Sequence, residues 1–100
     1  MKVNVQAVNF NVDKDLVDLI ENKINGLLKF YDNIIDAQVH LKVQKTSVKE
    51  NKELEIRLGI PGYDPVVKKT ANSFETALNQ SVAVLKKTLI KLKEKQREKH

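Results

Sequence analysis

The carboxy-terminal stretch of the sequence, LKKTLIKLKEKQREKH at residues 85–100, concentrates the charge of the chain. Residues 86–100 hold seven basic and two acidic residues, whereas residues 1–85 hold eleven of each, so the net charge of +5 lies entirely after Leu85. At helical spacing the basic residues follow two flanks, one with Lys87, Lys91 and Lys95 and the other with Lys86, Lys93 and Arg97. A positive field confined to one element attracts polyanions from a distance, which indicates a polyanion as the partner.

The competing interpretation is a solvated helix end that has no partner. Lysine near a helix carboxy terminus complements the helix dipole, and its long side chain keeps an amphipathic helix soluble. On that interpretation acidic residues would be mixed in freely, yet the stretch contains only Glu94 and Glu98. Since like charges four residues apart repel by about a few tenths of a kcal/mol per pair, we favour a counter-charge from outside the molecule.

Residue types that support catalysis or metal binding are sparse. There is no cysteine, and the two histidines are His40, on the polar side of an alternating segment, and the terminal His100. Asp32 and Asp36 could coordinate a cation, although turn formation is the simpler role for them. The GIPGYDP segment at residues 59–65 lacks the helix start that a phosphate-binding loop needs. We therefore expect no enzymatic activity, no cofactor and no bound metal.

Segments with an apolar residue at every second position predict strands. They run over Val3–Ala7, Ala37–Val43 and Leu54–Ile60. KTSVKENK at residues 45–52 predicts a polar hairpin connection, and the proline and glycine of residues 59–65 predict a turn. A short strand over residues 66–69 follows, and Pro65 places it at a sheet edge because proline cannot donate to a strand ladder.

Two segments change to spacings of three and four, which predicts amphipathic helices. The first helix has Asp13 as its N-cap and contains Gly26, which we expect to let the helix lie close to the sheet. In the second helix, Asn72 followed by Glu75 has the spacing of a capping box. The two apolar stripes consist of Leu16, Val17, Ile20, Ile24, Leu27 and Leu28, and of Phe74, Ala77, Leu78, Val82, Leu85, Leu89 and Leu92.

The resulting order, β-α-β-β-β-α, predicts an α+β fold with a four-stranded mixed sheet and two helices packed on one face. The strand–helix–strand opening requires a parallel crossover, and the hairpins that follow are antiparallel. Because each strand is apolar on one side only, the other sheet face should stay polar and open. One hundred residues is the length of one domain, so we expect residues 1–100 to form a single domain with its last few residues frayed.

The amino-terminal MKVNVQAVNF alternates in polarity and has no continuous apolar run, so we expect neither a signal peptide nor a membrane span. A cytoplasmic protein that is monomeric when free is the simplest interpretation. The five aromatic residues do not form a row on the predicted open sheet face. We therefore expect an RNA partner to be contacted through its phosphates and its shape rather than by base stacking.

In the order of its elements and in several local strings, the chain resembles the short ribosome hibernation promoting factors, whose family also includes the ribosome-associated translation inhibitors. The similar strings are FYDNIIDAQVHLKVQK at residues 30–45 and FETALNQSVAVLKKTLIKLKEK at residues 74–95, together with Lys23. The resemblance extends over essentially the whole chain, and the family has the same β-α-β-β-β-α fold. It implies binding to the small ribosomal subunit in the channel for messenger and transfer RNA, inhibition of translation, and storage of inactive ribosomes in a stress response.

The basic positions that match the family pattern are the candidate contacts with ribosomal RNA phosphates. With the neighbouring Lys86, they are Lys23, Lys29, Lys42, Lys45, Lys86, Lys87, Lys91, Lys93 and Lys95. Ser73, Glu75 and Asn79 depart from the pattern, because family members usually carry a tyrosine and acidic residues in this neighbourhood. The sequence ends with the last helix, so we expect no dimerisation of ribosomes through the carboxy-terminal domain of the long family members.

Two other binding functions compete with this one. VVKKTA at residues 66–71 resembles the lysine cluster with which the final helix of double-stranded RNA-binding domains begins, with Lys68 and Lys69 as the phosphate contacts and Asn72 where another lysine is expected. The second alternative is a protein-interaction module that uses the open sheet face or the edge strand. Salt sensitivity separates this module from an RNA-binding protein.

Overall fold

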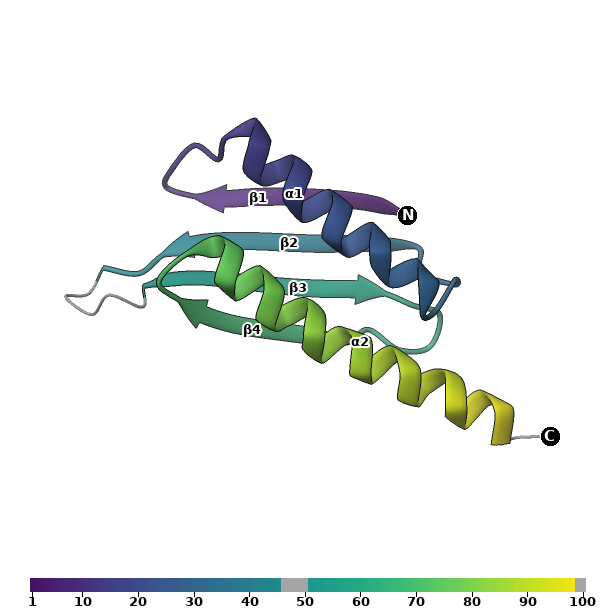
Figure 1. Cartoon of the computed structure of the whole chain (residues 1–100). Helices are drawn as coiled ribbons and strands as arrows, with labels where there is room; N and C mark the ends of the chain where they lie inside the picture. Colours follow the sequence, from purple (N-terminus) through teal and green to yellow (C-terminus); the bar gives the residue numbers. More distant parts are fainter. Residues whose placement is uncertain (46–50, 99–100) are drawn as a thin grey trace.

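The computed structural model describes residues 1–45 and 51–98, with side chains described up to Gln96 (Figure 1). The elements are β1 (Lys2–Val8), α1 (Lys14–Asn25), the 3-10 helix η1 (Gly26–Lys29), β2 (Asp36–Val43), β3 (Lys52–Gly59), β4 (Val66–Ala71) and α2 (Phe74–Glu98). This order confirms the predicted β-α-β-β-β-α arrangement. Most of the predicted hairpin connection, the side chain of Arg97 and the predicted fraying around His100 lie outside the described residues.

The four strands form one mixed sheet in the order β1-β2-β3-β4. β1 runs parallel to β2, with Val5 opposite Val39, whereas the β2–β3 and β3–β4 pairs are antiparallel. Parallel neighbours need a crossover connection, and α1 supplies it. β4 lies at the edge, as Pro65 predicted, and the Pro65 carbonyl accepts a 3.0 Å hydrogen bond from the amide of Leu58.

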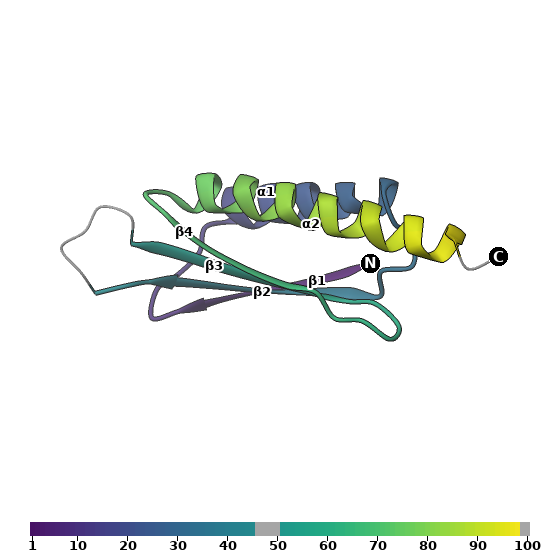
Figure 2. The same ribbon diagram turned by 90° about the horizontal axis from the view of Figure 1, so that it is seen from below.

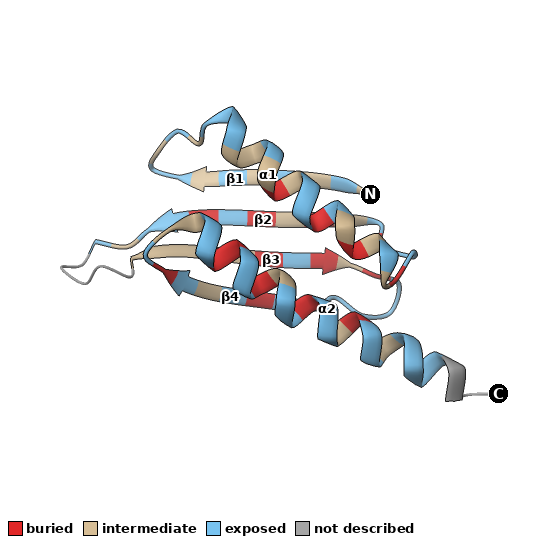
Figure 3. Ribbon diagram, viewed as in Figure 1, coloured by how far each residue is buried: buried red, intermediate tan, exposed pale blue. Residues whose placement is uncertain are grey.

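Both helices lie side by side on one face of the sheet, which confirms the predicted two-layer architecture (Figure 2). The strands alternate accordingly: Val39 and Leu41 of β2 are buried, whereas His40 and Lys42 are exposed. Figure 3 shows buried segments on the strands beneath the helices. The amphipathic strands therefore leave one sheet face uncovered by any described element.

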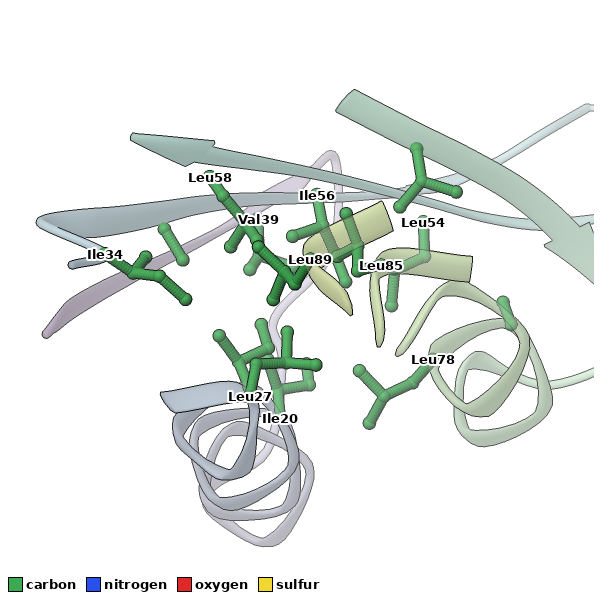
Figure 4. Close-up of a cluster of buried hydrophobic side chains, with 14 of the residues drawn as sticks. Ile20, Leu27, Ile34, Val39, Leu54, Ile56, Leu58, Leu78, Leu85 and Leu89 are labelled. Atoms are coloured by element: carbon green, nitrogen blue, oxygen red, sulfur yellow. The ribbon is translucent and has the colours of Figure 1, made fainter. Parts of the chain in front are cut away.

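The core lies between the sheet and the two helices, and side chains from both layers point into it (Figure 4). Ile20 and Ile24 of α1 are fully buried, as are Leu78 and Leu89 of α2. At one end of the core the rings of Phe10 and Phe74 stack with their centroids 5.4 Å apart. The sheet contributes Ala37, Val39, Leu41, Leu54, Ile56 and Leu58, all of which have no exposed surface.

The first helix begins as predicted but ends earlier. The Asp13 carboxylate accepts a 2.7 Å hydrogen bond from the amide of Leu16, which confirms the N-cap. The α-helix stops at Asn25, and Gly26 opens the tighter 3-10 turn of η1. No atom lies within 4 Å of the place where a Cβ of Gly26 would be, so the predicted close approach to the sheet is wrong. The missing side chain instead lowers helix propensity at the point where the α-helix changes to 3-10 geometry.

The cap of the last helix is also shifted by one residue from the prediction. The Ser73 hydroxyl accepts a 3.1 Å hydrogen bond from the amide of Thr76, and α2 begins at Phe74. The predicted capping box with Asn72 is therefore wrong. The core stripe of α2 also includes Ser81, which is fully buried and donates a 2.8 Å hydrogen bond to the Ala77 carbonyl. Ser81 thus satisfies its hydroxyl within the helix and does not interrupt the packing.

Candidate nucleic-acid interface

The second half of α2 extends past the sheet (Figure 1). Contacts at two places along the helix hold it on the rest of the fold. Leu85 and Leu89 are buried in the core. Closer to the carboxy terminus, Nε2 of Gln96 donates a 2.7 Å hydrogen bond to the hydroxyl of Tyr31, which lies in the connection between η1 and β2. The lysines between these contacts therefore project from a helix segment that is fixed on the rest of the fold.

Three of the predicted site residues gather around the ring of Phe30, and we refer to Lys29, Lys86 and Lys93 as the Phe30 cluster. The ammonium group of Lys86 lies 4.9 Å from the centre of the ring, within the range of a cation–π contact. Lys29 and Lys93 line a hollow of about 210 Å³ together with Phe30, Ile90 and Glu94. Lysines from η1 and α2 thus converge on one place, and Glu94 is the acidic residue among them.

A second group forms on the other flank of α2. Lys91 and Lys95 line an open hollow of about 520 Å³ that is also lined by the turn between β3 and β4. That turn contributes Gly62 and Tyr63, and α2 contributes Thr88 and Leu92 as well as the two lysines. We refer to Tyr63, Lys91 and Lys95 as the Tyr63 cluster.

The remaining two predicted site lysines of the helical layer are Lys87 and Lys23. Both are exposed, Lys87 one turn before Lys91 on α2 and Lys23 in the last turn of α1. Seven of the nine predicted site residues therefore belong to the helical layer, where a single extended polyanion can contact several of them.

Lys42 and Lys45 are placed elsewhere. Lys42 is exposed on the open sheet face, opposite Glu53 of β3, and Lys45 lies just beyond the end of β2. This end of the molecule is opposite to the carboxy-terminal end of α2, along a longest dimension of 52 Å (Figure 1). The fold does not bring these two lysines together with those of the helical layer.

The lysines of α2 carry little internal compensation. In the described part of the chain, the ion pairs shorter than 4.0 Å are both made by Lys68, at 3.8 Å from Glu53 and 3.9 Å from Glu55. Among the side chains that the structure describes, no carboxylate is paired with Lys86, Lys87, Lys91, Lys93 or Lys95. Described carboxylates therefore do not neutralise their charge, which faces solvent as a polyanion-binding surface requires.

The arrangement does not match the double-stranded RNA-binding alternative. Lys68 and Lys69 lie within β4, whereas that alternative places them at the start of the last helix, which here begins at Phe74. Successive strand residues point to opposite faces, so the two lysines cannot grip one phosphate group together. Lys68 is moreover engaged with Glu53 and Glu55 on the open face.

Neither a cluster of metal ligands nor a membrane-spanning helix occurs in residues 1–45 and 51–98. Among them, no three His, Cys, Asp or Glu side chains come together as metal ligands would. Neither helix in this part of the chain combines the length and the apolar character needed to cross a membrane.

The sequence did not single out Tyr63, which the structure places beside Lys91 and Lys95. The PG dipeptide at residues 61–62 predicted the turn, but nothing along the chain relates this turn to α2, which begins eleven residues after Tyr63. The contact of Lys86 with the ring of Phe30 could likewise not be predicted from the sequence, because the two residues lie far apart along the chain.

The sequence matches the family described as Sigma 54 modulation protein / S30EA ribosomal protein over residues 3–97. Among characterised proteins, it is 31% identical over 96 residues to the ribosome hibernation promoting factor of Azotobacter vinelandii, covering 96% of this chain and 86% of the relative. It is 30% identical over 96 residues to the protein of the same name from Pseudomonas putida, covering 96% of this chain and 90% of the relative.

Two solved structures share the fold at low sequence identity. The N-terminal domain of Thermus thermophilus Protein Y superposes with a TM-score of 0.79 and 19% identity, over 92% of this chain and 99% of that domain. A ribosomal subunit interface protein from Coxiella burnetii superposes with a TM-score of 0.83 and 16% identity, over 94% of this chain and 99% of that protein. These likenesses confirm the arrangement of four strands and two helices.

Proposed function

The chain belongs to the Sigma 54 modulation protein / S30EA ribosomal protein family, which includes the ribosome hibernation promoting factors, and from this we propose that it binds the small ribosomal subunit through ribosomal RNA phosphates. Bound in the channel for messenger and transfer RNA, it blocks translation and stores inactive ribosomes. The proposal includes a cytoplasmic location, residues 1–100 as one ribosome-binding domain, and no catalytic activity.

The observation that carries the proposal is the unpaired positive charge on the fixed second half of α2. Among the side chains that the structure describes, no carboxylate pairs with the lysines of this segment, and the buried residues Leu85 and Leu89 hold the helix in place. Because the backbone of this segment is already ordered in the helix, only the lysine side chains lose conformational freedom when they contact a phosphate backbone. Each phosphate that it neutralises releases condensed counterions, which supplies sequence-independent affinity.

Within this proposal the nine lysines act as two groups. Those of the helical layer form the main contact, and Lys42 and Lys45 touch a separate RNA segment near the far end of the sheet. Because Lys42 lies opposite Glu53, its contribution is smaller than that of an uncompensated lysine such as Lys91.

Sedimentation with purified ribosomes tests the proposal. The wild-type protein should travel with the 30S particle in a sucrose gradient, and the double variant Lys87→Glu/Lys91→Glu should remain near the top. A matched control is Lys2→Glu/Lys14→Glu, which makes the same change in net charge at exposed residues of β1 and α1 outside the site. The control should sediment like the wild type.

The outcomes separate the competing functions. Equal loss of binding in both double variants would mean that net charge alone matters and that α2 is a solvated helix end. Binding that survives both reversals and is insensitive to salt would favour the protein-interaction alternative on the open sheet face.

A further inference from the structure

Tyr63 differs from the other aromatic residues in having a free ring. Phe10 and Phe74 stack on each other, the ring of Phe30 lies under Lys86, and Tyr31 is buried with its hydroxyl bonded to Gln96. Tyr63 is instead 46% exposed. Contact with a ligand would remove the apolar surface of this ring from water, which favours binding at this position.

The backbone holds Tyr63 in a defined position. Its amide donates a 2.9 Å hydrogen bond to the carbonyl of Ile60, across Pro61 and Gly62. Gly62 has a φ of 78°, and proline followed by glycine with this positive φ is the sequence and geometry of a type II turn. Proline restricts the turn further by fixing its own φ. The ring is therefore presented by a stiff turn, and little conformational entropy is lost when a flat ligand stacks on it.

The hollow beside the ring has the composition of a nucleotide site. Lys91, Leu92 and Lys95 of α2 line it together with Tyr63 of the turn. The volume of about 520 Å³ is within the range of small-ligand pockets, about 300–1,000 Å³. Asp64 follows Tyr63 in the chain but does not line the hollow. An aromatic surface beside two cations matches a ligand with one flat ring and adjoining phosphates.

We infer that the Tyr63 cluster binds one unpaired nucleotide of an RNA strand, with its base stacked on Tyr63 and its flanking phosphates on Lys91 and Lys95. An unpaired base is required because the faces of a base within a helix are already covered by its neighbours. The inference rests on the proposed function, and it adds a base-stacking contact to an interface that the sequence predicted to recognise RNA by its phosphates and its shape.

Substitutions at Tyr63 test the site on the ribosome. Tyr63→Phe keeps the ring and should bind small subunits like the wild type, whereas Tyr63→Ala should bind about 5- to 150-fold more weakly, the range for loss of one stacked base. The salt dependence should be the same for all three proteins, since no phosphate contact is removed. Equal affinity of Tyr63→Ala and Tyr63→Phe would overturn the inference and leave the proposed function intact.

A second experiment does not depend on the ribosome. The chain has no tryptophan, so Tyr63→Trp introduces a single fluorescent reporter at the site. The probes are hexauridylate and a hexamer of abasic ribose phosphate with the same charge. Stacking predicts that hexauridylate quenches the tryptophan emission and that the abasic hexamer does not, although both bind. Quenching by both probes, or by neither at saturating concentration, would contradict a base-stacking site.

Discussion

The Gln96 amide nitrogen donates a 2.7 Å hydrogen bond to the Tyr31 hydroxyl and thereby joins the carboxy-terminal turns of α2 to the connection between η1 and β2. Tyr31 is 7% exposed, so its ring is packed in the fold and gives the Gln96 side chain a fixed partner. This contact holds α2 at a point beyond Leu92, where the helix leaves the sheet and carries its lysines.

We predict that Gln96→Ala frees this end of the helix. The loss of one hydrogen bond should lower the free energy of unfolding by about 0.5–1.5 kcal/mol, and amide hydrogen exchange should accelerate in the last two turns of α2. The control is Gln80→Ala, an exposed glutamine on the same helix, which should change neither quantity. Unchanged exchange in Gln96→Ala would show that the hydrogen bond does not hold the helix.

Ile24 should be a principal contributor to stability because it is fully buried between α1 and the sheet. Truncation in Ile24→Ala should lower the free energy of unfolding by about 2–5 kcal/mol, measured by urea denaturation. Lys91→Ala, at an exposed position, should stay within about 0.5 kcal/mol of the wild type. A wild-type midpoint for Ile24→Ala would be incompatible with the packing of α1 on the sheet.

The two candidate caps of α2 can be compared directly. Because the Ser73 hydroxyl accepts from the amide of Thr76, Ser73→Ala should cost about 0.5–2 kcal/mol of stability. Asn72→Ala should be nearly neutral, since Asn72 is exposed and precedes the cap. Thermal melts of the two variants at equal concentration measure the difference, and the reverse ranking would restore the capping box that the sequence predicted.

Salt dependence should reveal the number of phosphates that α2 contacts. Each lost contact should reduce the slope of log affinity against log salt by about 0.7–0.9. Lys87→Glu/Lys91→Glu should therefore bind small subunits weakly and with a flatter slope, while its melting temperature stays close to that of the wild type because both side chains are exposed. Superimposable salt curves for the variant and the wild type would rule out phosphate contacts at these two lysines.

The sequence by itself determined the elements, their order and the polarity of their faces. Period-two segments such as Ala37–Val43 became strands with one buried side, and the stripe through Ile20 and Ile24 became the buried side of α1. Pro65 correctly predicted an edge strand. These features follow from local periodicity and local covalent geometry, which depend only on residues that are close together in the sequence. The concentration of charge after Leu85 is also a property of the sequence alone.

Other features were decided by the tertiary structure. Asn72 and Ser73 are both suitable N-caps, and the position of the first helical residue, Phe74 stacked on Phe10, selects between them. Gly26 marks a change of helix type rather than a close approach, because nothing is packed against it.

The grouping of the lysines likewise depends on contacts between distant parts of the chain. The fold places α2 beside η1 and beside the β3–β4 turn. As a result Lys86 contacts Phe30 and Gln96 contacts Tyr31. Lys91 lines a hollow together with Tyr63 of the turn. Periodicity states which face of a helix is buried, but it holds no information about which residues lie across from that face. The packing of the helix on the sheet determines those neighbours. It therefore also determines how the lysines divide between the two clusters.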